Sequence, residues 1–232
     1  MSPALSIVMP CLNEAAGIAA TLTRLQPLRA RGIEVVVVDG GSSDDTLRLA
    51  TPLADRAIVA PRGRASQMNA GAAIARGGAL LFLHADCTLP AGADRLIIDG
   101  LAAGAKHWGR FDVAFDGAHA CMRTVACMMN WRSRLTGIAT GDQGIFVKRD
   151  LFLAHHGFPD IALMEDLALS KRLRIHSAPL CLAERITPSA RRWEERGVAR
   201  TILLMWRLRL QYFFGVDPAK LALRYDSVRS RN

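Results

Sequence analysis

Apolar residues occur in the first half of the chain as short unbroken runs, and most of these runs stop at a proline, a glycine or an acidic residue. Runs of four or five apolar residues are typical of strands that are buried on both faces of a parallel sheet. Stretches with apolar residues three or four positions apart separate the runs and predict helices. The expected strands are 5–9, 34–38, 57–59 and 79–83, and the expected helices are 14–27, 46–49, 65–76 and 94–101.

The pattern changes after position 104. Strands are expected at 110–115 and 144–147, and helices at 121–135, 165–175 and 198–214. The regular alternation in the first half predicts an α/β fold, with a mostly parallel central sheet flanked by helices on both faces and with amphipathic helices at the C-terminal end. No internal repeat or Gly/Ser linker interrupts the chain, so we expect one continuous domain over residues 1–232.

The stretch 198–214 combines a broad apolar and aromatic face with three arginines, at positions 200, 207 and 209. That many charges in 17 residues argue against a transmembrane span. The pattern is typical of a helix that packs on the domain or at a homodimer contact. It is equally typical of a helix that lies at a membrane surface, so both interpretations stay open.

Composition narrows the class of protein. Half of the residues are hydrophobic and 22% are charged, which excludes a disordered chain. From Arg185 onward, eleven Lys or Arg residues face four acids, so this tail carries seven of the nine net positive charges. It favours either an anionic partner or a simple solvated face. Aromatic residues do not interleave with these charges, so we expect no nucleic-acid binding.

The number and spacing of the cysteines indicate the cellular compartment of the protein. The chain has five of them, with no Cys-x-x-Cys pair and no secretory signal peptide before them. We therefore expect reduced thiols in a cytoplasmic protein, with contact at the inner membrane as the alternative that 198–214 raises. A structural zinc site is not expected, because the paired ligand spacing is missing.

Acidic residues stand at three informative places. Asp39 ends the second apolar run, Asp86 ends the fourth, and Glu165 with Asp166 begins a predicted helix. The carboxyl ends of parallel strands meet at one edge of a sheet, where ligands of open α/β folds bind. We therefore expect Asp39, Asp86 and Asp166 to face a common cleft. The alternatives are that Asp39 only caps a turn and that the acidic pair only stabilises a helix dipole.

The glycines Gly40 and Gly41 after Asp39 let a ligand approach the backbone closely. Nicotinamide or flavin binding is not expected, because a Gly-x-Gly-x-x-Gly motif is absent after the first strand, and a Walker-type phosphate loop is absent as well. Asp86 fits a divalent ion that binds a nucleotide diphosphate, since such an ion needs only one or two protein carboxylates. His84 lies two residues before Asp86, so its side chain should point to the same side of the strand. It would there be a metal ligand or a donor contact, and the alternative is a core histidine.

Glu165 and Asp166 point about 100° apart on a helix. One of them should face the cleft, and we expect Asp166 to be the general base and Glu165 to orient it or the acceptor. Two polar segments supply further candidate contacts to a phosphorylated or polyhydroxylated ligand. They are Arg62, Arg64 and Gln67 in the first segment, and Asp142 and Gln143 in the turn 140–144.

Several of these motifs occur in a fixed order over most of residues 5–175. They are segment 6–10 with Asn13 and Glu14, segment 38–44, segment 84–86 and the pair 165–166. Together they resemble the family 2 glycosyltransferases of the GT-A fold. Segments 63–71 and 141–144 further resemble a small bacterial subgroup, the arsenosugar-biosynthesis-type (radical-SAM/selenodomain-associated) glycosyltransferases.

The resemblance implies a Rossmann-like GT-A fold with a nucleotide-binding half (1–104), an acceptor half (105–190) and a basic helical tail (191–232). It implies inverting transfer of a sugar from a nucleotide-diphosphate donor to a small-molecule or lipid-linked acceptor, with Mn²⁺ or Mg²⁺ as cofactor. Asp86 would bind the metal and Asp166 would be the base, while His84 stands where the family's metal motif has its first Asp. The donor-binding candidates are Pro10, Asn13, Glu14, Asp39, Arg64, Gln67, His84, Asp142 and Gln143.

Rival functions stay open at this point. One is transfer to a polyprenyl-phosphate-type acceptor at a membrane surface, which the basic aromatic stretch 198–214 motivates. Another is a catalytically degenerate protein that only binds a nucleotide sugar, which His84 motivates. A nucleotidyltransferase is disfavoured, because Glu165 and Asp166 would then have no evident task. Trp193, after two arginines, is read either as a ring that stacks on a sugar or as a core residue.

Overall fold

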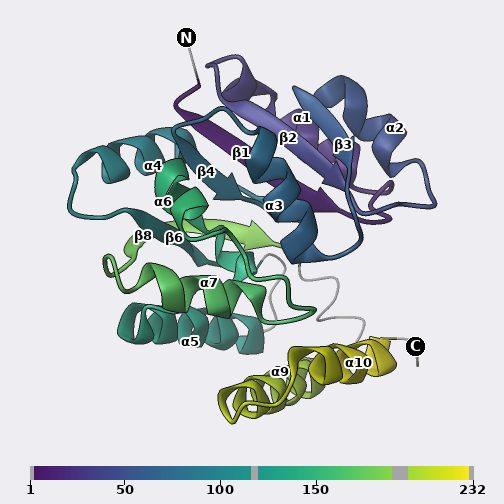
Figure 1. Ribbon diagram of the computed structural model, residues 1–232, viewed down its shortest axis with the longest axis vertical. Coiled ribbons are helices and arrows are strands. Elements are labelled where there is room, and N and C mark those ends of the chain that lie inside the picture. The colour runs from purple at the N-terminus through teal and green to yellow at the C-terminus, as the bar shows by residue number, and fades with distance from the viewer. Residues whose placement is uncertain (1–2, 116–119, 190–197, 230–232) are drawn as a thin grey trace.

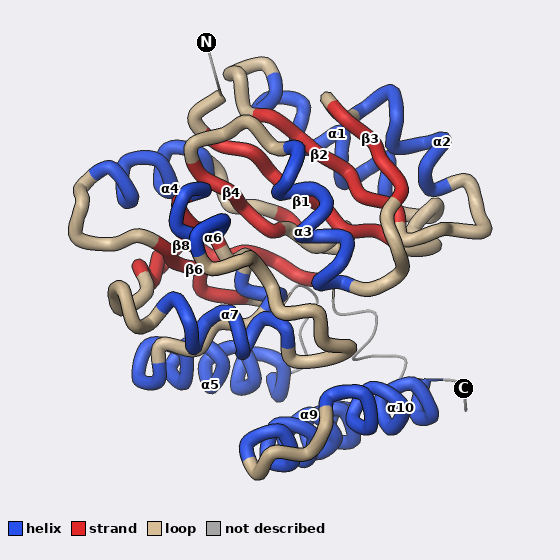
Figure 2. Tube along the Cα trace, in the orientation of Figure 1, coloured by secondary structure: helices blue, strands red, loops and turns tan. Residues whose placement is uncertain are grey.

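An eight-stranded sheet forms the centre of the protein, in the order β3-β2-β1-β4-β7-β6-β8-β5. The computed structural model describes residues 3–115, 120–189 and 198–229, and Figures 1 and 2 show the course of the chain. The strands are β1 (Leu5–Cys11), β2 (Glu34–Asp39), β3 (Arg56–Val59), β4 (Ala79–Phe82), β5 (Cys87–Thr88), β6 (Trp108–Val113), β7 (Phe146–Lys148) and β8 (Leu180–Pro188). Strands β1 to β4 run parallel, whereas β7 is antiparallel to both of its neighbours.

Helices cover both faces of the sheet, as predicted. They are α1 (Ile18–Arg29), α2 (Thr46–Ala50), α3 (Arg64–Ile74), α4 (Ala93–Ala102), α5 (Ala120–Thr136), α6 (Arg149–Ala154), α7 (Glu165–Leu173), α9 (Val198–Phe213) and α10 (Pro218–Arg229). Two 3₁₀ turns, Thr51–Leu53 and Gly141–Gln143, complete the set. Successive residues of β1 alternate between two cores: Ile7 and Met9 pack with α1, α4 and α5, and Val8 packs with α3, α6 and α7.

The packing of α3 on the sheet depends on a glycine. A Cβ atom at Gly71 would lie 2.5 Å from Val8 Cγ1 and 2.8 Å from Val38 Cγ2, which is far inside ordinary contact distance. The absence of a side chain there lets α3 approach the middle of β1 and β2. This close approach brings the first turn of α3, and with it Arg64, near the carboxyl ends of the central strands.

Several element bounds differ from the sequence-based expectations. Helix α1 begins at Ile18 instead of Glu14, and Asn13, the expected cap, adopts a positive φ of 54° in the preceding loop. The helix also continues past Pro27 to Arg29, so that the proline lies in the last turn, two residues before the helix end. Strands β5 and β8 and helices α6 and α10 were not expected. The middle of β8 is exposed and its pairing with β6 shifts register, so it lacks the unbroken apolar run of a central strand.

Helices α9 and α10 form a hairpin at the C-terminal end of the described chain (Figure 1). A separate small core attaches the hairpin to α7 and the residue before it, through the buried side chains of Met164, Leu167, Leu208 and Leu221. Within the described ranges, the helices are all too short or too polar to cross a bilayer.

Candidate active site

Two loops at the carboxyl ends of β1 and β2 are joined into one rigid unit. The Asn13 backbone N–H donates to Ser42 Oγ (2.9 Å), and the Asn13 side-chain oxygen accepts from the Ser43 N–H (2.9 Å). The Glu14 N–H donates to Thr46 Oγ1 (2.7 Å). The loop from Pro10 to Glu14 is thus fixed by the turn that follows Asp39. Its contact with a donor stays a prediction.

Asp39 is almost fully buried, with 2% of its surface exposed. Its carboxylate accepts hydrogen bonds from the Gly41 N–H (3.0 Å), the Ser42 N–H (2.8 Å) and the Ser42 hydroxyl. The turn-capping role considered for Asp39 is therefore present. A nucleoside contact would have to share the same oxygens, and it stays a prediction.

Gln67 and Gln143 are buried, and their side-chain amides form hydrogen bonds with backbone and side-chain groups. The Gln67 amide donates to the carbonyls of Cys11 and Val38, both at 2.8 Å, and so ties the ends of β1 and β2 together. The Gln143 amide donates to Ser133 Oγ (3.1 Å), and its oxygen accepts from the Thr140 N–H (3.2 Å). Both side chains hold the framework of the site, and their assignment as donor contacts stays a prediction.

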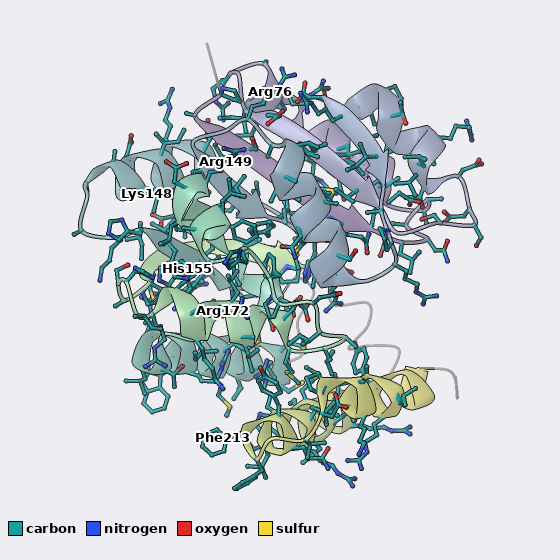
Figure 3. The ribbon with its side chains drawn as sticks, viewed as in Figure 1. Arg76, Lys148, Arg149, His155, Arg172 and Phe213 are labelled. Carbon is teal, nitrogen blue, oxygen red and sulfur yellow. The ribbon has the colours of Figure 1, made fainter. Side chains whose placement is uncertain are left out.

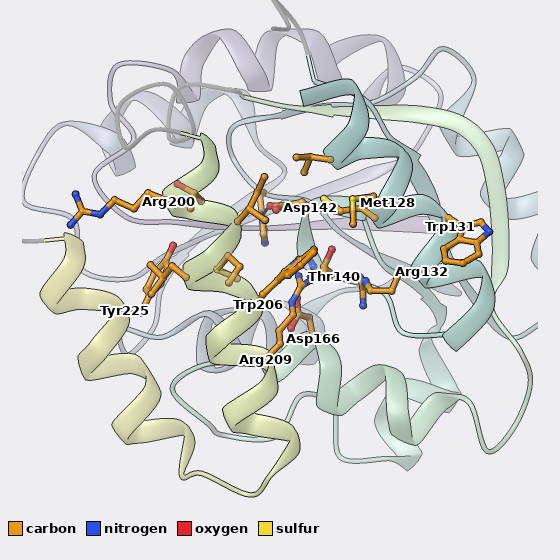
Figure 4. A pocket seen from close by; sticks show the side chains of 18 of the residues that line it. Met128, Trp131, Arg132, Thr140, Asp142, Asp166, Arg200, Trp206, Arg209 and Tyr225 are labelled. Atoms are coloured by element: carbon orange, nitrogen blue, oxygen red, sulfur yellow. Dashed lines mark hydrogen bonds and ion pairs between the residues drawn. The ribbon is translucent and has the colours of Figure 1, made fainter. Parts of the chain in front are cut away.

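A cavity of about 430 Å³ lies between α5, the turn Gly141–Gln143, the start of α7 and the α9–α10 hairpin (Figure 4). Four of the predicted site residues line it, namely Arg64, His84, Asp142 and Asp166. Neither Asp39 nor Asp86 is among the lining residues. Of the three acids at 39, 86 and 166, Asp166 lines this cavity, and the expected convergence of all three on one cleft stays a prediction.

Two backbone N–H groups hold the Asp166 carboxylate at the start of α7. The Gly141 N–H donates to one oxygen (2.9 Å) and the Leu167 N–H to the other (2.8 Å). Gly141 also touches His84, because a Cβ at this position would lie 2.6 Å from His84 Nε2. A single residue without a side chain thus sets the spacing between the carboxylate and the imidazole.

Glu165 is not among the residues that line the main cavity; it lines a smaller one together with Arg64, His84 and Asp166, so Asp166 borders both cavities. Only 5% of its surface is exposed, and it follows Met164, whose φ is 71°. Burial raises the pKa of Glu165 above its ordinary value of 4.5, the Asp166 charge raises it further, and Arg64 and His84 act in the opposite direction. The two acids therefore have different environments, as expected for residues about 100° apart on a helix.

The residues near Asp86 include potential ligands for a metal ion. Potential ligand atoms of His84, Asp86 and Cys87 lie within 4.8 Å of one another. His84 Nδ1 lies 3.3 Å from Asp142 Oδ1 but outside hydrogen-bond geometry, so this buried nitrogen is left without a hydrogen bond. One carboxylate and one imidazole at this separation fit a divalent ion that takes its other ligands from phosphate and water.

Two arginines of the cavity were missed in the sequence. Arg132 from α5 and Arg209 from α9 both line it, close to Asp166 (Figure 4). Burial, and then the Arg209 charge, lower the pKa of Arg132 to about 10. Arg209 was noted only as one of three charges that argue against a transmembrane span, and Arg132 carried no local signal, because only the folded chain brings the two helices together. Residues 191–193, with Trp193, lie outside the described residues.

Residues 6–152 match the family model described as Glycosyl transferase family 2. A PGL/p-HBAD biosynthesis glycosyltransferase of Mycobacterium tuberculosis (strain ATCC 25177 / H37Ra) is 39% identical over 95 residues, which cover 38% of this chain and 37% of that protein. The succinoglycan biosynthesis protein ExoA of Rhizobium meliloti (strain 1021) is 38% identical over 109 residues, which cover 43% of this chain and 33% of that protein. The matched part of the chain thus spans little more than a third of these curated relatives.

Solved glycosyltransferase structures share the fold. The mannosyltransferase PcManGT from Pyrobaculum calidifontis, solved with GDP-Man and Mn²⁺, superposes with a TM-score of 0.64 at 21% identity and covers 90% of this chain and 61% of that one. TarS 1-349 of S. aureus, solved with UDP, gives a TM-score of 0.63 at 17% identity, covering 80% and 60%. At such identities the likeness concerns the fold alone, and it confirms the expected GT-A architecture.

The family match contains the parallel strands β1 to β4 and the cavity residues Arg64, His84 and Asp142. The narrower resemblance to the arsenosugar-biosynthesis-type subgroup is not shown by these relatives. The family-level expectation is confirmed, because the matched segment covers more than half of the chain. This chain belongs to glycosyl transferase family 2.

Proposed function

We propose that this protein transfers a sugar from a nucleotide-diphosphate donor to an acceptor hydroxyl, with inversion at the anomeric carbon. The observation that carries the proposal is the position of Asp166, whose carboxylate is fixed by two N–H groups in a cavity shared with Arg64 and His84. A carboxylate held in this way is ready to accept a proton from a bound hydroxyl.

The reaction divides among the residues around the cavity. Asp166 removes the acceptor proton as the hydroxyl oxygen attacks the anomeric carbon, and the bond to the diphosphate breaks on the opposite face. Arg64, at the first turn of α3, offers a guanidinium to the departing diphosphate. Glu165 lines a smaller cavity together with Arg64 and Asp166, and its proposed role is to orient the base or the acceptor.

A divalent ion fits beside this arrangement, held by Asp86 with His84. When bound, it would neutralise charge on the leaving diphosphate. The imidazole nitrogen suits Mn²⁺ better than the strictly oxygen-binding Mg²⁺, so we propose Mn²⁺ as the preferred metal. UDP and GDP, which are named for the TarS and PcManGT complexes, are the bases to test first as donors.

The narrower subgroup remains part of the proposal. Its two segments, 63–71 and 141–144, contribute Arg64, Gly141 and Asp142 to the same cavity. These two segments lie far apart in the sequence and meet at one site, which supports the resemblance to the subgroup more strongly than either segment alone. For the acceptor we propose a small molecule first.

The direct test is a panel of UDP-, GDP- and TDP-sugars with Mn²⁺, measuring release of the nucleoside diphosphate. Asp166→Asn should slow turnover by about 10²–10⁴. Asp99→Asn, at an exposed position of α4, is the matched control and should behave as wild type. Turnover by D166N close to the wild-type rate would contradict the base assignment. Donor binding without any turnover by the wild-type protein would support the degenerate binding protein instead.

A second candidate, transfer to a lipid-linked acceptor at a membrane surface, is favoured by one observation. Away from the cavity, α9 exposes large apolar side chains, with Leu203 at 66%, Leu210 at 58% and Phe213 at 74%; Phe214, directly after the helix, is 74% exposed, and Phe213 projects into open space (Figure 3). Packing on the domain explains the other side of α9, which contributes Leu208 to the small core. Aromatic rings on a basic helix are typical of interfacial membrane binding.

Flotation with anionic and neutral vesicles tests this second candidate. Wild-type protein should float with anionic vesicles, and a Phe213→Ser/Phe214→Ser variant should stay at the bottom of the gradient. Val59→Ser, an exposed apolar position on the distant edge strand β3, is the control. A wild-type protein that does not float argues against membrane contact. Concentration-dependent dimerisation lost in the same double variant would assign the exposed face to a second copy.

A further inference from the structure

Two arginines of the cavity stand out by their buried guanidinium nitrogens. Within the described part of the chain, Arg132 Nε and Nη2 and Arg209 Nε are buried and lack hydrogen-bond partners. Neither arginine forms an ion pair with another described residue. Buried cations without partners are costly, because they lose water and gain no compensating bond. Arg110, whose charge acts on Arg132, also has a buried Nε without a hydrogen-bond partner, but its guanidinium is ion-paired to Asp112 and donates to the Asn130 carbonyl.

The charges around Arg132 do not neutralise it. Arg209 and Arg110 act on it as like charges, and Asp166 is the opposite charge that reaches it. The Asp166 oxygens are already engaged by the N–H groups of Gly141 and Leu167. Arg64 and Arg200 also line the cavity, against the two acids Asp142 and Asp166, so positive charge dominates its wall.

The nitrogen atoms of Arg132 without partners, Nε and Nη2, are those that bind an oxyanion. Nε and Nη2 form the edge of a guanidinium that binds a carboxylate or a phosphate through two parallel hydrogen bonds. On Arg132 that whole edge is buried and unoccupied by protein groups. Figure 4 shows Arg132 and Arg209 entering from different helices toward the region of Asp166. An oxyanion placed there would meet both guanidinium groups.

Much of the remaining wall is apolar. Methionine, aromatic and aliphatic side chains of α5, α9 and α10 line the same cavity as the two arginines, including Met128, Met129, Ile202, Met205, Trp206 and Tyr225. A cavity volume of about 430 Å³ suits a small organic molecule. The combination of a cationic centre and an apolar wall selects a ligand that carries an oxyanion on an apolar body.

We propose that Arg132 and Arg209 form a subsite for a carboxylate or phosphate group of the acceptor, whose apolar part lies between α5 and α9. The word acceptor rests on the proposed transferase function, since the cavity also contains the proposed base. The subsite places the anionic group beside Asp166, so that the hydroxyl to be glycosylated lies close to the oxyanion in the acceptor molecule.

Binding of simple probes to the full chain tests the subsite without a known acceptor. Octyl phosphate, octanoate and octanol are titrated by calorimetry or by the fluorescence change of the cavity tryptophan Trp206. The two anions should bind at least about tenfold more tightly than octanol, since a hydrogen bond to a charged group contributes about 1.5–3 kcal/mol. Comparison of octyl phosphate with octanoate shows which oxyanion the subsite prefers. Equal affinity for octanol and both anions would overturn the proposal.

Variants locate the binding. Arg132→Gln and Arg209→Gln should each weaken anion binding about tenfold or more, and Arg132→Lys should weaken it less, because it keeps the charge and loses the two-bond edge. Arg207→Gln, on the exposed side of α9, is the matched control and should bind as wild type. Circular dichroism verifies that each variant is folded. Loss of anion binding in R207Q equal to that in R209Q would refute the assignment.

Donor hydrolysis separates this inference from the proposed function. With Mn²⁺ and the best donor of the panel, R132Q and R209Q should lose affinity for octyl phosphate by a larger factor than they lose affinity for the donor. A loss of donor affinity in both variants, with octyl phosphate binding intact, would assign the two arginines to the donor diphosphate and overturn the acceptor subsite. Absence of all donor turnover in the wild type would refute the transferase proposal, while the probe titrations would still decide the oxyanion subsite.

Discussion

Replacing Gly141 by alanine tests how closely the catalytic groups are spaced. The new Cβ would lie 2.6 Å from His84 Nε2 and 2.7 Å from His84 Cε1, so about 0.8 Å is missing relative to an ordinary contact of 3.4 Å. His84 is buried and cannot yield freely. If residue 141 moves instead, its N–H withdraws from Asp166, and a 2.9 Å hydrogen bond lengthens beyond useful range.

Strain against His84 should lower stability, and movement of residue 141 should lower turnover. Overpacking a buried site costs about 1–3 kcal/mol, which lowers the Tm of a chain of this size by several degrees. Displacement of a catalytic group by about 1 Å reduces turnover by about 100-fold. Donor turnover and a thermal melt of Gly141→Ala measure the two effects separately.

Gly78→Ala is the matched control for this prediction. Its Cβ would meet the Ala4 carbonyl oxygen at 3.6 Å, an ordinary contact, so both Tm and turnover should stay near wild type. A G141A protein with the wild-type Tm and turnover would show that residue 141 does not set the spacing between His84 and Asp166.

Four further changes have defined outcomes. Glu165→Gln should be increasingly more stable than wild type as pH rises above 4.5, because the raised pKa of Glu165 gives a stability contribution that is present at low pH and lost as the buried group ionises; equal melting curves at every pH would contradict this. Gly71→Ala should lower stability by about 1–3 kcal/mol in denaturant titrations, since its Cβ overlaps Val8 and Val38. Gln67→Ala should cost about 1–3 kcal/mol, because it leaves two buried carbonyls unpaired; an unchanged midpoint would speak against the bridge between β1 and β2. Asp86→Asn should weaken Mn²⁺ binding, measured by calorimetry with UDP present, more than Cys87→Ser does, because the carboxylate is the harder ligand.

Much of the fold was predictable because the central strands are buried on both faces. The run that ends in Asp39 is apolar throughout, and every residue of β2 is buried. Strand β8 was missed for the opposite reason: residues 183–185 in its middle are exposed, and its partner β6 lies far away in the sequence. Local pattern therefore identifies the inner strands of this sheet and fails at its far side.

The candidate site was predictable in part. The positions of Arg64, His84, Asp142 and Asp166 in one cavity bring together motifs from four separate places in the chain. Asp39 shows the limit of such reasoning, because an acid before two glycines offers the same oxygens to a turn and to a ligand. Only coordinates show that the Gly41 and Ser42 N–H groups already use them.

Helix α9 forms one wall of the cavity, yet it lies beyond residue 152, where the family match ends. Two stretches of the chain therefore contribute the cavity wall, α5 inside the family match and α9 beyond it. Under the proposed function, exchange of α9 and α10 for the corresponding helices of a relative would change the apolar side of the acceptor pocket and leave Arg132 in place.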